Sequence, residues 1–152
     1  MIGRAVVSGP FGPMTLTEED GMITRLSWGD RGAIGGSAVL AEAARQLADY
    51  FAGRRREPFD LPLAFQPGLT GDVQRAMCVI PMGETRTYGD LSKALGVPAQ
   101  AIGQACGANP IPILIPCHRI LSATGLGGFS APGGVETKVA LLRHEGAASL
   151  LI

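Results

Sequence analysis

Alternating apolar and polar positions near the start of the chain predict three short strands. They cover Arg4 to Ser8, Met14 to Glu18 and Met22 to Trp28. Gly9-Pro10 and Glu19-Asp20-Gly21 separate them, and such residues favour turns over continued strands. This part of the chain is therefore predicted to form a small antiparallel sheet.

A helical pattern follows the predicted strands. Apolar residues between Ala38 and Ala52 recur at spacings of three and four, and Gly53 ends the pattern. Because this spacing puts the apolar side chains on one helix face, we expect the helix to cover one face of the sheet. An irregular stretch rich in proline then runs to Gly68. It is the natural linker, so the sequence predicts a domain boundary near residue 68.

The second half of the chain is mostly helical by pattern. Helices are predicted at 72–79, 88–95, 99–106 and 135–144, and a hairpin-like stretch is predicted at 120–129. Gly96-Val97-Pro98 separates the second helix from the third. This pair is a candidate helix-turn-helix, whose later helix would enter a DNA groove; a plain helical hairpin is the alternative. The predicted fold class is α+β, with a small N-terminal antiparallel sheet, one covering helix and a mostly helical C-terminal domain.

Composition narrows the choice of partners. The 152 residues are 46% hydrophobic, which is enough for a packed core and excludes a disordered chain. Thirteen basic and thirteen acidic residues cancel, so any nucleic acid must be bound by a local face. Residues 91–135 contain no Asp or Glu but do contain Lys93 and Arg119. Such a surface does not repel phosphates.

The location and the metal content are also constrained. No apolar run approaches the roughly 20 residues that span a bilayer, and the first residues lack a signal-peptide core. Cys78, Cys106 and Cys117 show no CxxC spacing, so neither a disulfide framework nor a metal site is expected. We therefore expect a cytoplasmic protein that does not bind a membrane.

Cys117 is the candidate nucleophile. It stands beside His118 and Arg119 and follows a rigid, proline-rich run. A free cysteine has a pKa of about 8.5, and nearby positive charge lowers this pKa and raises the thiolate fraction. The alternative is a buried structural cysteine, which is our interpretation of Cys78 and Cys106. Spacing alone leaves both interpretations of Cys117 open.

His118 is the candidate base. Adjacent helical residues do not face each other, so His118 could act on Cys117 only through a non-helical geometry or a bridging water. Glu136 and Glu145 are the only carboxylates after Asp90, and either could orient the imidazole. Glu136 is also explained as an acid in the first turn of a helix. Glu145 has no such explanation, although an ordinary solvated glutamate remains the alternative.

Several segments around Cys117 carry a resemblance to a known family. They are Asn109 to Ile120 with its Pro-Cys-His-Arg core, Gly127 to Ser130, Leu141 to Gly146, Ile80 to Thr85 with Tyr88, Tyr50 to Arg54 and Phe59 to Leu63. Together they resemble the O6-alkylguanine-DNA alkyltransferases over about residues 48–146. The Pro-Cys-His-Arg core in this setting is highly specific.

The resemblance implies a fold and an activity. It implies a ribonuclease-H-like α+β domain over residues 1–68, and a helix-turn-helix DNA-binding and alkyl-acceptor domain over 69–152. The expected activity is that of a methylated-DNA-protein-cysteine methyltransferase. Such a protein moves an alkyl group from O6-alkylguanine, with O4-alkylthymine as a second substrate, to its own cysteine. It acts once per molecule and needs no cofactor.

The same resemblance assigns roles to individual residues. The catalytic set is Cys117 as acceptor, His118 as the base acting through a water, Glu145 as its orienting group, Tyr88 as proton donor to the guanine, and Asn109 as the residue holding the preceding turn. Substrate contacts are expected from Ile120, Gly128, Phe129 and Ser130. DNA contacts are expected from Lys93, Ala99, Gln100, Ala101 and Arg119.

Two departures from the family pattern bear on the substrate. Gln100 stands where the family carries an arginine that fills the space left by a flipped base. Glutamine lacks the charge and the planar guanidinium, so weaker repair of duplex DNA or a preference for unpaired sites is expected. The turn Ser130-Ala131-Pro132-Gly133-Gly134 is longer than the family's form. This difference affects the rim of the pocket.

The leading hypothesis is thus a monomeric, single-turnover alkyltransferase acting on DNA that contains alkylated bases. One alternative is a non-catalytic binder of alkylated DNA that recruits other repair factors. Related binders replace the cysteine, whereas Cys117 is present here. A second alternative is a cysteine hydrolase that uses Cys117 and His118 through an acyl intermediate. That enzyme would need repeated turnovers and an oxyanion site.

Overall fold

The computed structural model describes residues 2–147 and divides the chain into two compact units. The first is Met1–Ala64 and the second is Phe65–Ile152. Each unit has its own layers and its own buried core.

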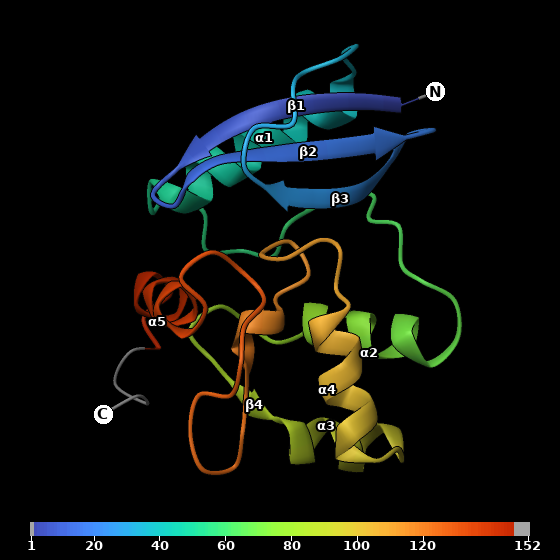
Figure 1. Cartoon of the computed structure of the whole chain (residues 1–152), viewed down its shortest axis with the longest axis vertical. Helices are drawn as coiled ribbons and strands as arrows, with labels where there is room; N and C mark the ends of the chain where they lie inside the picture. Colours follow the sequence, from blue (N-terminus) through green and yellow to red (C-terminus); the bar gives the residue numbers. More distant parts are fainter. Residues whose placement is uncertain (1, 148–152) are drawn as a thin grey trace. The chain divides into compact units, whose positions relative to one another are not determined.

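The first unit is a three-stranded antiparallel sheet covered by one helix (Figure 1). The strands are β1 (Ile2–Gly9), β2 (Gly12–Glu19) and β3 (Met22–Trp28), in that order across the sheet. The register between β2 and β3 shifts at Thr17/Glu18. The three strands are confirmed where the sequence predicts them, with β1 and β2 slightly longer because every residue of β1 pairs with β2.

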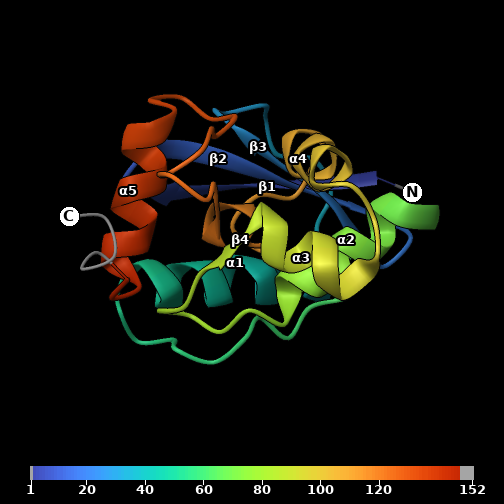
Figure 2. The same ribbon diagram turned by 90° about the horizontal axis from the view of Figure 1, so that it is seen from below.

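The covering helix is α1 (Ala38–Phe51), which lies along one face of the sheet (Figure 2). The Ser37 side chain accepts a hydrogen bond from the Leu40 amide at 3.1 Å and so begins the helix. Every third or fourth residue of α1 is apolar and buried, and packs over alternate residues of the strands. These core residues are Met14, Leu16, Ile23, Leu26, Leu40, Ala43, Leu47 and Tyr50. The predicted helix and its packing on the sheet are confirmed.

The second unit is mostly helical. Its elements are α2 (Gly68–Cys78), β4 (Arg86–Thr87), α3 (Tyr88–Leu95), α4 (Ala99–Gly107), a single 3-10 turn η1 (Cys117–Arg119), β5 (Ile120–Leu121) and α5 (Val135–His144). The first of these helices begins before the predicted residue 72. The Gln74 side chain accepts a hydrogen bond from the Gln66 amide at 2.8 Å, which draws the preceding chain onto the helix.

In the helix pair α3 and α4, both ends of α3 are well defined. Thr87 and Asp90 form a reciprocal capping box at the start of α3. Gly96 ends α3 in the left-handed conformation, with φ 68°, and α4 begins after Pro98. The two helices pack against each other, and α4 also packs on α2. Entry of α4 into a DNA groove stays a prediction.

The predicted hairpin at 120–129 is wrong in its main pairing. Strand β5 does not fold back on the following residues but pairs in parallel with β4, Arg86 opposite Ile120 and Thr87 opposite Leu121. Only a single bridge, Ser122 with Gly125, is hairpin-like. The cause is long-range, because Ile120 is completely buried and β4 supplies the neighbouring strand. Within residues 2–147 no helix is both long and apolar enough to cross a bilayer.

Candidate active site

The loop before Cys117 is held rigid by its own side chains. Asn109 donates a hydrogen bond from Nδ2 to the Ile115 carbonyl at 2.9 Å and accepts one from the Ile111 amide at 3.0 Å. Ile111, Ile113 and Ile115 are completely buried, and Ile113 adopts φ 72°, a left-handed conformation rare for a β-branched residue. These contacts close the loop that leads to Cys117, whereas the catalytic role of Asn109 stays a prediction.

Cys117 opens the 3-10 turn η1 and faces a cavity. Its amide donates to the Ile115 carbonyl at 2.8 Å, and the Ile120 amide donates to the Cys117 carbonyl. Within this turn His118 and Arg119 are both buried. The backbone therefore places the thiol at a pocket and the next two side chains in the interior. Because Cys117 and His118 lie in one 3-10 turn and their side chains diverge, of the two geometries considered from the sequence only a bridging water could connect them.

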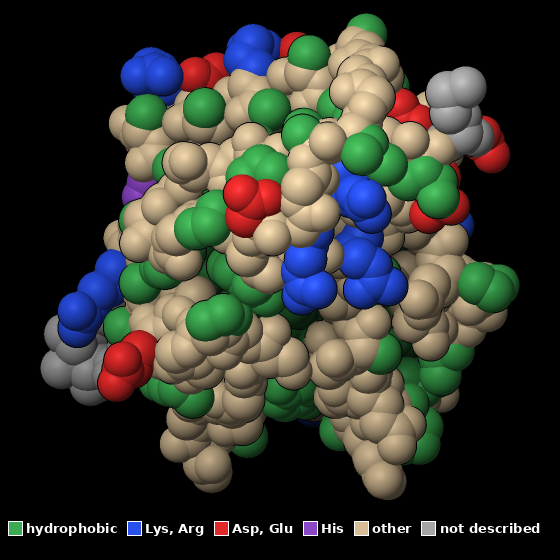
Figure 3. Space-filling model, turned by 45° about the horizontal axis from the view of Figure 1, so that its top comes forward, with side chains coloured by type: hydrophobic (Ala, Val, Ile, Leu, Met, Phe, Trp, Pro, Cys, Tyr) green, Lys and Arg blue, Asp and Glu red, His purple; other side chains and the backbone are tan. Residues whose placement is uncertain are grey.

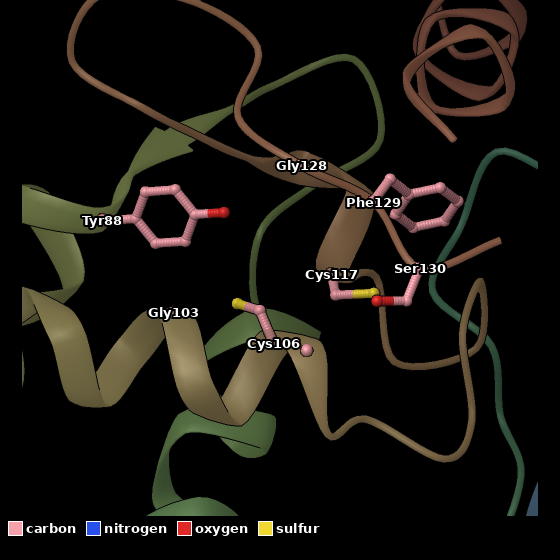
Figure 4. Close-up of a pocket in the computed structure, with 8 residues that line it drawn as sticks. Tyr88, Gly103, Cys106, Cys117, Gly128, Phe129 and Ser130 are labelled. Carbon is pink, nitrogen blue, oxygen red and sulfur yellow. The ribbon is translucent and has the colours of Figure 1, made fainter. Parts of the chain in front are cut away.

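The pocket next to Cys117 has a volume of about 210 Å³. It is lined by Tyr88, Gly103, Cys106, Gly107, Cys117, Gly128, Phe129 and Ser130, which come from α3, α4, η1 and the loop before α5. Figure 4 shows the Cys117 sulfur and the Ser130 hydroxyl pointing toward each other, and the Tyr88 hydroxyl pointing into the same space. Burial raises the pKa of Tyr88, so its phenol keeps its proton at neutral pH.

Behind the pocket, His118 belongs to a buried hydrogen-bonded group. Its Nε2 lies 2.7 Å from Oε2 of Glu145, and both side chains are completely buried. Arg119 donates to both oxygens of the same carboxylate, at 2.8 and 3.0 Å, and to the Ile80 carbonyl at 2.7 Å. Among the described residues, Nδ1 of His118 has no hydrogen-bond partner. Glu145 therefore fixes the imidazole through one nitrogen and leaves the other available.

Burial and charge set the protonation states of this group. Burial alone would raise the pKa of Glu145, but the hydrogen bonds and charges of His118 and Arg119 outweigh it and lower the pKa to about 2. Burial lowers the pKa of His118 despite the opposing effect of Glu145, so the imidazole is neutral at pH 7. Since Glu145 is ionised and can only accept, Nε2 carries the imidazole proton and Nδ1 is a free base.

Burial raises the pKa of Cys117, although the Asn109 hydrogen bond and the charge of Lys138 oppose it. Desolvation of the Cys117 thiol therefore outweighs the neighbouring positive charge, which by itself would lower this pKa. A proton must be taken from Cys117 before it can act as a nucleophile. The neutral imidazole beside it has the correct protonation state for this task.

Comparison with known proteins agrees with this geometry. Residues 4–65 match the model of the 6-O-methylguanine DNA methyltransferase ribonuclease-like domain, and residues 69–147 match that of the DNA binding domain of the same family. The chain belongs to the 6-O-methylguanine DNA methyltransferase family. Both halves of the chain are covered by these matches, so membership does not depend on the Pro-Cys-His-Arg motif alone.

Individual relatives of this family are similar over nearly their whole length. The chain is 38% identical to the methylated-DNA--protein-cysteine methyltransferase of Mycolicibacterium paratuberculosis, covering 95% of this chain and 93% of the relative. It is 35% identical to that of Metallosphaera sedula, covering 96% and 94%. The crystal structure of the Mycobacterium tuberculosis O6-methylguanine methyltransferase matches with a TM-score of 0.83 at 33% identity, covering 97% of this chain and 94% of that one. A structure of the M. tuberculosis protein in complex with DNA matches with a TM-score of 0.81 at 34% identity, covering 95% and 93%. The α+β fold class is confirmed.

Most of the site residues predicted from the methyltransferase family pattern gather at one place. Cys117, Gly128, Phe129, Ser130 and Tyr88 line the pocket, whereas His118, Glu145 and Asn109 do not and are instead held by hydrogen bonds next to the Cys117 turn. Ile120 is completely buried and does not line the pocket, and its substrate contact stays a prediction. Lys93, Ala99, Gln100 and Ala101 do not line the pocket. Lys93 on α3 and Ala99 and Gln100 on α4 are exposed, and Ala101 is half-buried.

Arg119 requires a correction. It is buried, and each of its three guanidinium nitrogens donates a hydrogen bond, two of them to Glu145 and one to the Ile80 carbonyl. Arg119 therefore cannot make the DNA phosphate contact expected of it without breaking a buried ion pair. The sequence could not show this, because a carboxylate 26 positions away supplies the partner.

Two further residues next to the site were not predicted. Cys106 lines the pocket, and burial raises the pKa of its thiol to about 12, so it stays protonated. Lys138 on α5 is completely buried. Its spacing gives a usable signal, because Lys138, Leu142 and Glu145 follow one helix face at intervals of four and three. Within residues 2–147 no group of three His, Cys, Asp or Glu side chains could hold a metal ion.

Proposed function

We propose that this protein repairs DNA by transferring the alkyl group of O6-alkylguanine to Sγ of its own Cys117, once per molecule, with O4-alkylthymine as a second substrate. The observation that carries the proposal is the placement of Cys117 at a pocket, next in the chain to His118, whose imidazole is hydrogen-bonded to the buried Glu145. An acceptor thiol, a neutral base and a group that orients the base are what such a transfer requires.

The first step is removal of the thiol proton. A water between Cys117 and Nδ1 of His118 passes the proton from Sγ to the imidazole. The carboxylate of Glu145, 2.7 Å from Nε2, stabilises the imidazolium that forms. Arg119 keeps Glu145 ionised and prevents it from rotating, because it binds both carboxylate oxygens.

The second step moves the alkyl group. The Cys117 thiolate attacks the alkyl carbon, a C–S bond forms, and the C–O bond to the guanine breaks with its electron pair left on the base. The Tyr88 hydroxyl, which points into the pocket (Figure 4), donates a proton to the guanine ring. Tyr88 is then reprotonated by solvent as His118 releases the proton it took. The products are an S-alkylcysteine and an unmodified guanine.

The products explain the single turnover. A thioether has no polarised carbonyl that water could attack, unlike the acyl intermediate of a cysteine hydrolase. Cys106, the other thiol in the pocket, stays protonated and so does not remove the alkyl group from Cys117. The alkylated protein therefore accumulates, and each molecule repairs one base.

Access to the pocket requires the alkylated base to leave the helix. Flipping a base costs a few kcal/mol, which contacts to the surrounding DNA must offset. We infer that Gln100, Ala99 and Ala101 on α4, with Lys93 on α3, make these contacts, because α4 also contributes Gly103, Cys106 and Gly107 to the pocket. The backbone of Gly128 and Phe129 and the Ser130 hydroxyl would bind the base. We further propose that the protein is a monomer and acts in the cytoplasm, where the Cys117 thiol stays reduced.

A count of product per protein tests the proposal. We expect at most one O6-methylguanine repaired per wild-type molecule, none by Cys117→Ala, and an unchanged yield by the matched variant Cys78→Ala. DNA binding by Cys117→Ala should stay near wild type, measured by fluorescence anisotropy at fixed salt. Repeated turnover would identify a hydrolase instead. Binding without any repair by the wild type would identify a non-catalytic binder.

A further inference from the structure

The arginines of the first unit differ in whether an acid of the protein neutralises them. Arg45 on α1 and Arg54, which follows α1, both pair with the Asp49 carboxylate at 3.1 Å. Within the described part of the chain, three arginines of this unit form no ion pair: Arg4, Arg25 and Arg31. The protein itself therefore leaves their charges without a counter-ion.

The register of the sheet puts two of these arginines in one row. Arg4 on β1 and Arg25 on β3 are both opposite Thr17 on β2. Residues that lie directly opposite each other project from the same face of a sheet. Since neighbouring strands are about 4.8 Å apart, the backbone positions of the two arginines are about 10 Å apart. Two unpaired cations thus share one face.

The row of arginines lies on the face that α1 does not cover. A Cβ placed on Gly3 would lie 3.0 Å from the Leu40 side chain of α1. Arg4 follows Gly3 and points the other way, because successive strand residues alternate between the two faces. In the described part of the first unit α1 is the only helix, so no helix covers the opposite face (Figure 1). We call this side of the sheet the outer face.

Thr15 holds the third arginine over the outer face. Thr15 is two residues from Thr17 on β2, about 7 Å along the same face. Its hydroxyl donates to the Gly29 carbonyl at 2.8 Å and accepts a hydrogen bond from the Arg31 amide at 2.9 Å. Thr15 is completely buried, whereas Arg31 is exposed. The segment after β3 therefore brings a third unpaired cation next to the row.

The acids near the outer face do not neutralise these arginines. Asp30 accepts a hydrogen bond from the Gly32 amide at 2.8 Å, and Glu19 accepts one from the Thr24 hydroxyl at 3.0 Å. Arg4 is only half-buried, but its Nε is buried and has no hydrogen-bond partner among the described residues. The outer face is therefore positive in a chain whose net charge is zero.

A DNA-binding protein needs such a surface, because phosphate contacts from Lys and Arg supply most of the affinity that is independent of sequence. The helix α4 has no charged side chain. Arg119 is buried in its pair with Glu145. Duplex DNA carries one negative charge per about 1.7 Å of its axis, so a row of cations about 10 Å long can meet several phosphates. The charge of the outer face is complementary to this backbone.

We propose that the outer face of the sheet is a second DNA-binding surface, on which Arg4, Arg25 and Arg31 bind phosphates of the DNA backbone. The inference deepens the proposed function and rests on it, because DNA is the polyanion that this function brings to the protein. Phosphate contacts position DNA without identifying its bases. The outer face therefore adds affinity for any DNA sequence, and no step of the alkyl transfer takes place on it.

The test compares two double variants that lose the same total charge. Arg25→Gln/Arg31→Gln removes two unpaired cations of the outer face. Arg45→Gln/Arg54→Gln is the matched control, because it removes two ion-paired cations from the same unit. Arg25→Lys/Arg31→Lys keeps the charge of the outer face. Binding of the full-length proteins to undamaged duplex DNA is measured by fluorescence anisotropy at several salt concentrations.

We expect the affinity of Arg25→Gln/Arg31→Gln for duplex DNA to fall by about tenfold at low salt. The slope of log affinity against log salt concentration should become shallower by about 1.8, which is about 0.9 for each lost phosphate contact. The lysine variant and the matched control should keep the wild-type slope. Arginines with a merely structural role would lower the thermal unfolding midpoint without changing this slope.

Equal slopes for the wild type and a folded Arg25→Gln/Arg31→Gln variant would overturn the inference. Equal losses in this variant and in the matched control would also overturn it, because net charge alone would then explain the effect. If the double variant does not fold, Arg25→Gln is measured alone, with an expected change in slope of about 0.9; an unchanged slope would again overturn the inference. Failure of the proposed function looks different, because the wild type would then show the arginine-dependent slope but gain no methyl group on Cys117 from DNA carrying O6-methylguanine.

Discussion

The two units of the molecule bury different kinds of side chain. The core of Met1–Ala64 is apolar, and its buried polar residues hold backbone in place. Gln46, for example, exchanges two hydrogen bonds with the backbone of Asp60 at 3.0 and 3.1 Å. The unit Phe65–Ile152 instead brings His118, Arg119, Lys138 and Glu145 together out of water. Since burying charge is costly, we infer that the second unit keeps these residues for chemistry.

The surface helix α4 of the second unit differs from the interior of that unit in its charged side chains. The helix α4, which we expect to contact DNA, has no charged side chain at all. Figure 3 shows another face of the molecule, where Lys and Arg side chains lie in small groups with Asp and Glu side chains nearby. The charges that take part in the proposed reaction therefore lie inside the second unit, whereas α4 itself offers no charge to DNA.

The largest effect on the rate of alkyl transfer is expected when a buried glutamate of the second unit is replaced by glutamine, compared with the same replacement in the first unit. Glu145→Gln removes the partner of His118 and leaves Arg119 buried without its carboxylate, which costs about 3 to 5 kcal/mol of folding free energy. We expect the rate of alkyl transfer to fall by about 100-fold or more. Glu18→Gln is the control, because Glu18 is also buried but accepts hydrogen bonds from the Ser37 side chain and from the Gly21 amide, the latter at 3.2 Å, and not from a histidine and an arginine. Single-turnover assays measure the transfer rates of the two variants. Equal rates would contradict the inference that the buried charges of the second unit serve the chemistry.

Acid should weaken the second unit through the same glutamate. The pKa of Glu145 is lowered from 4.5 to about 2 on folding. Its ionisation therefore stabilises the folded protein above the unfolded-state pKa, and this stabilisation is lost as the pH falls through the folded-state value. It is on the order of 3 kcal/mol. Urea unfolding of wild type and Glu145→Gln should show a stability difference that narrows between pH 4.5 and about pH 2. A constant difference across this window would contradict the assignment.

Much of the fold follows from the sequence, because periodicity reports which face of an element is buried. Strand β3 and the helices α3 and α5 have the bounds that the pattern predicts. The parallel pairing of β4 with β5 could not be predicted, since no local pattern indicates a partner strand 34 positions away. The interior position of Arg119 was missed for the same reason. Its positive charge suggested DNA, whereas a distant carboxylate determines its place.

The wall of the pocket offers a smaller test within the second unit. Gly127→Ala would place a methyl group 3.2 Å from the Tyr88 hydroxyl, in a backbone conformation that disfavours side chains. We expect the transfer rate to fall by about tenfold, equivalent to about 1.4 kcal/mol. Gly125→Ala is the control, because the nearest atom to its Cβ is 3.9 Å away. Equal single-turnover rates for both variants would show that this wall does not position Tyr88.

The smallest expected effect concerns the uncharged helix. Gln100→Arg adds a cation to α4 and should tighten binding to duplex DNA a few-fold at low salt. The slope of log affinity against log salt concentration should steepen by about 0.9, the value for one further phosphate contact. Fluorescence anisotropy titrations at several salt concentrations measure both. An unchanged slope would place Gln100 away from the DNA backbone.

Alkylation of Cys117 is the central claim, and intact-protein mass spectrometry tests it most directly. The protein is incubated with an oligonucleotide carrying one O6-methylguanine, as a single strand and as a duplex, and the adduct is located by peptide mapping. We predict a gain of one methyl group on Cys117, with Cys78 and Cys106 unmodified. A free Cys117 thiol without an adduct after incubation with both substrates, or a methyl group on another residue, would contradict this account.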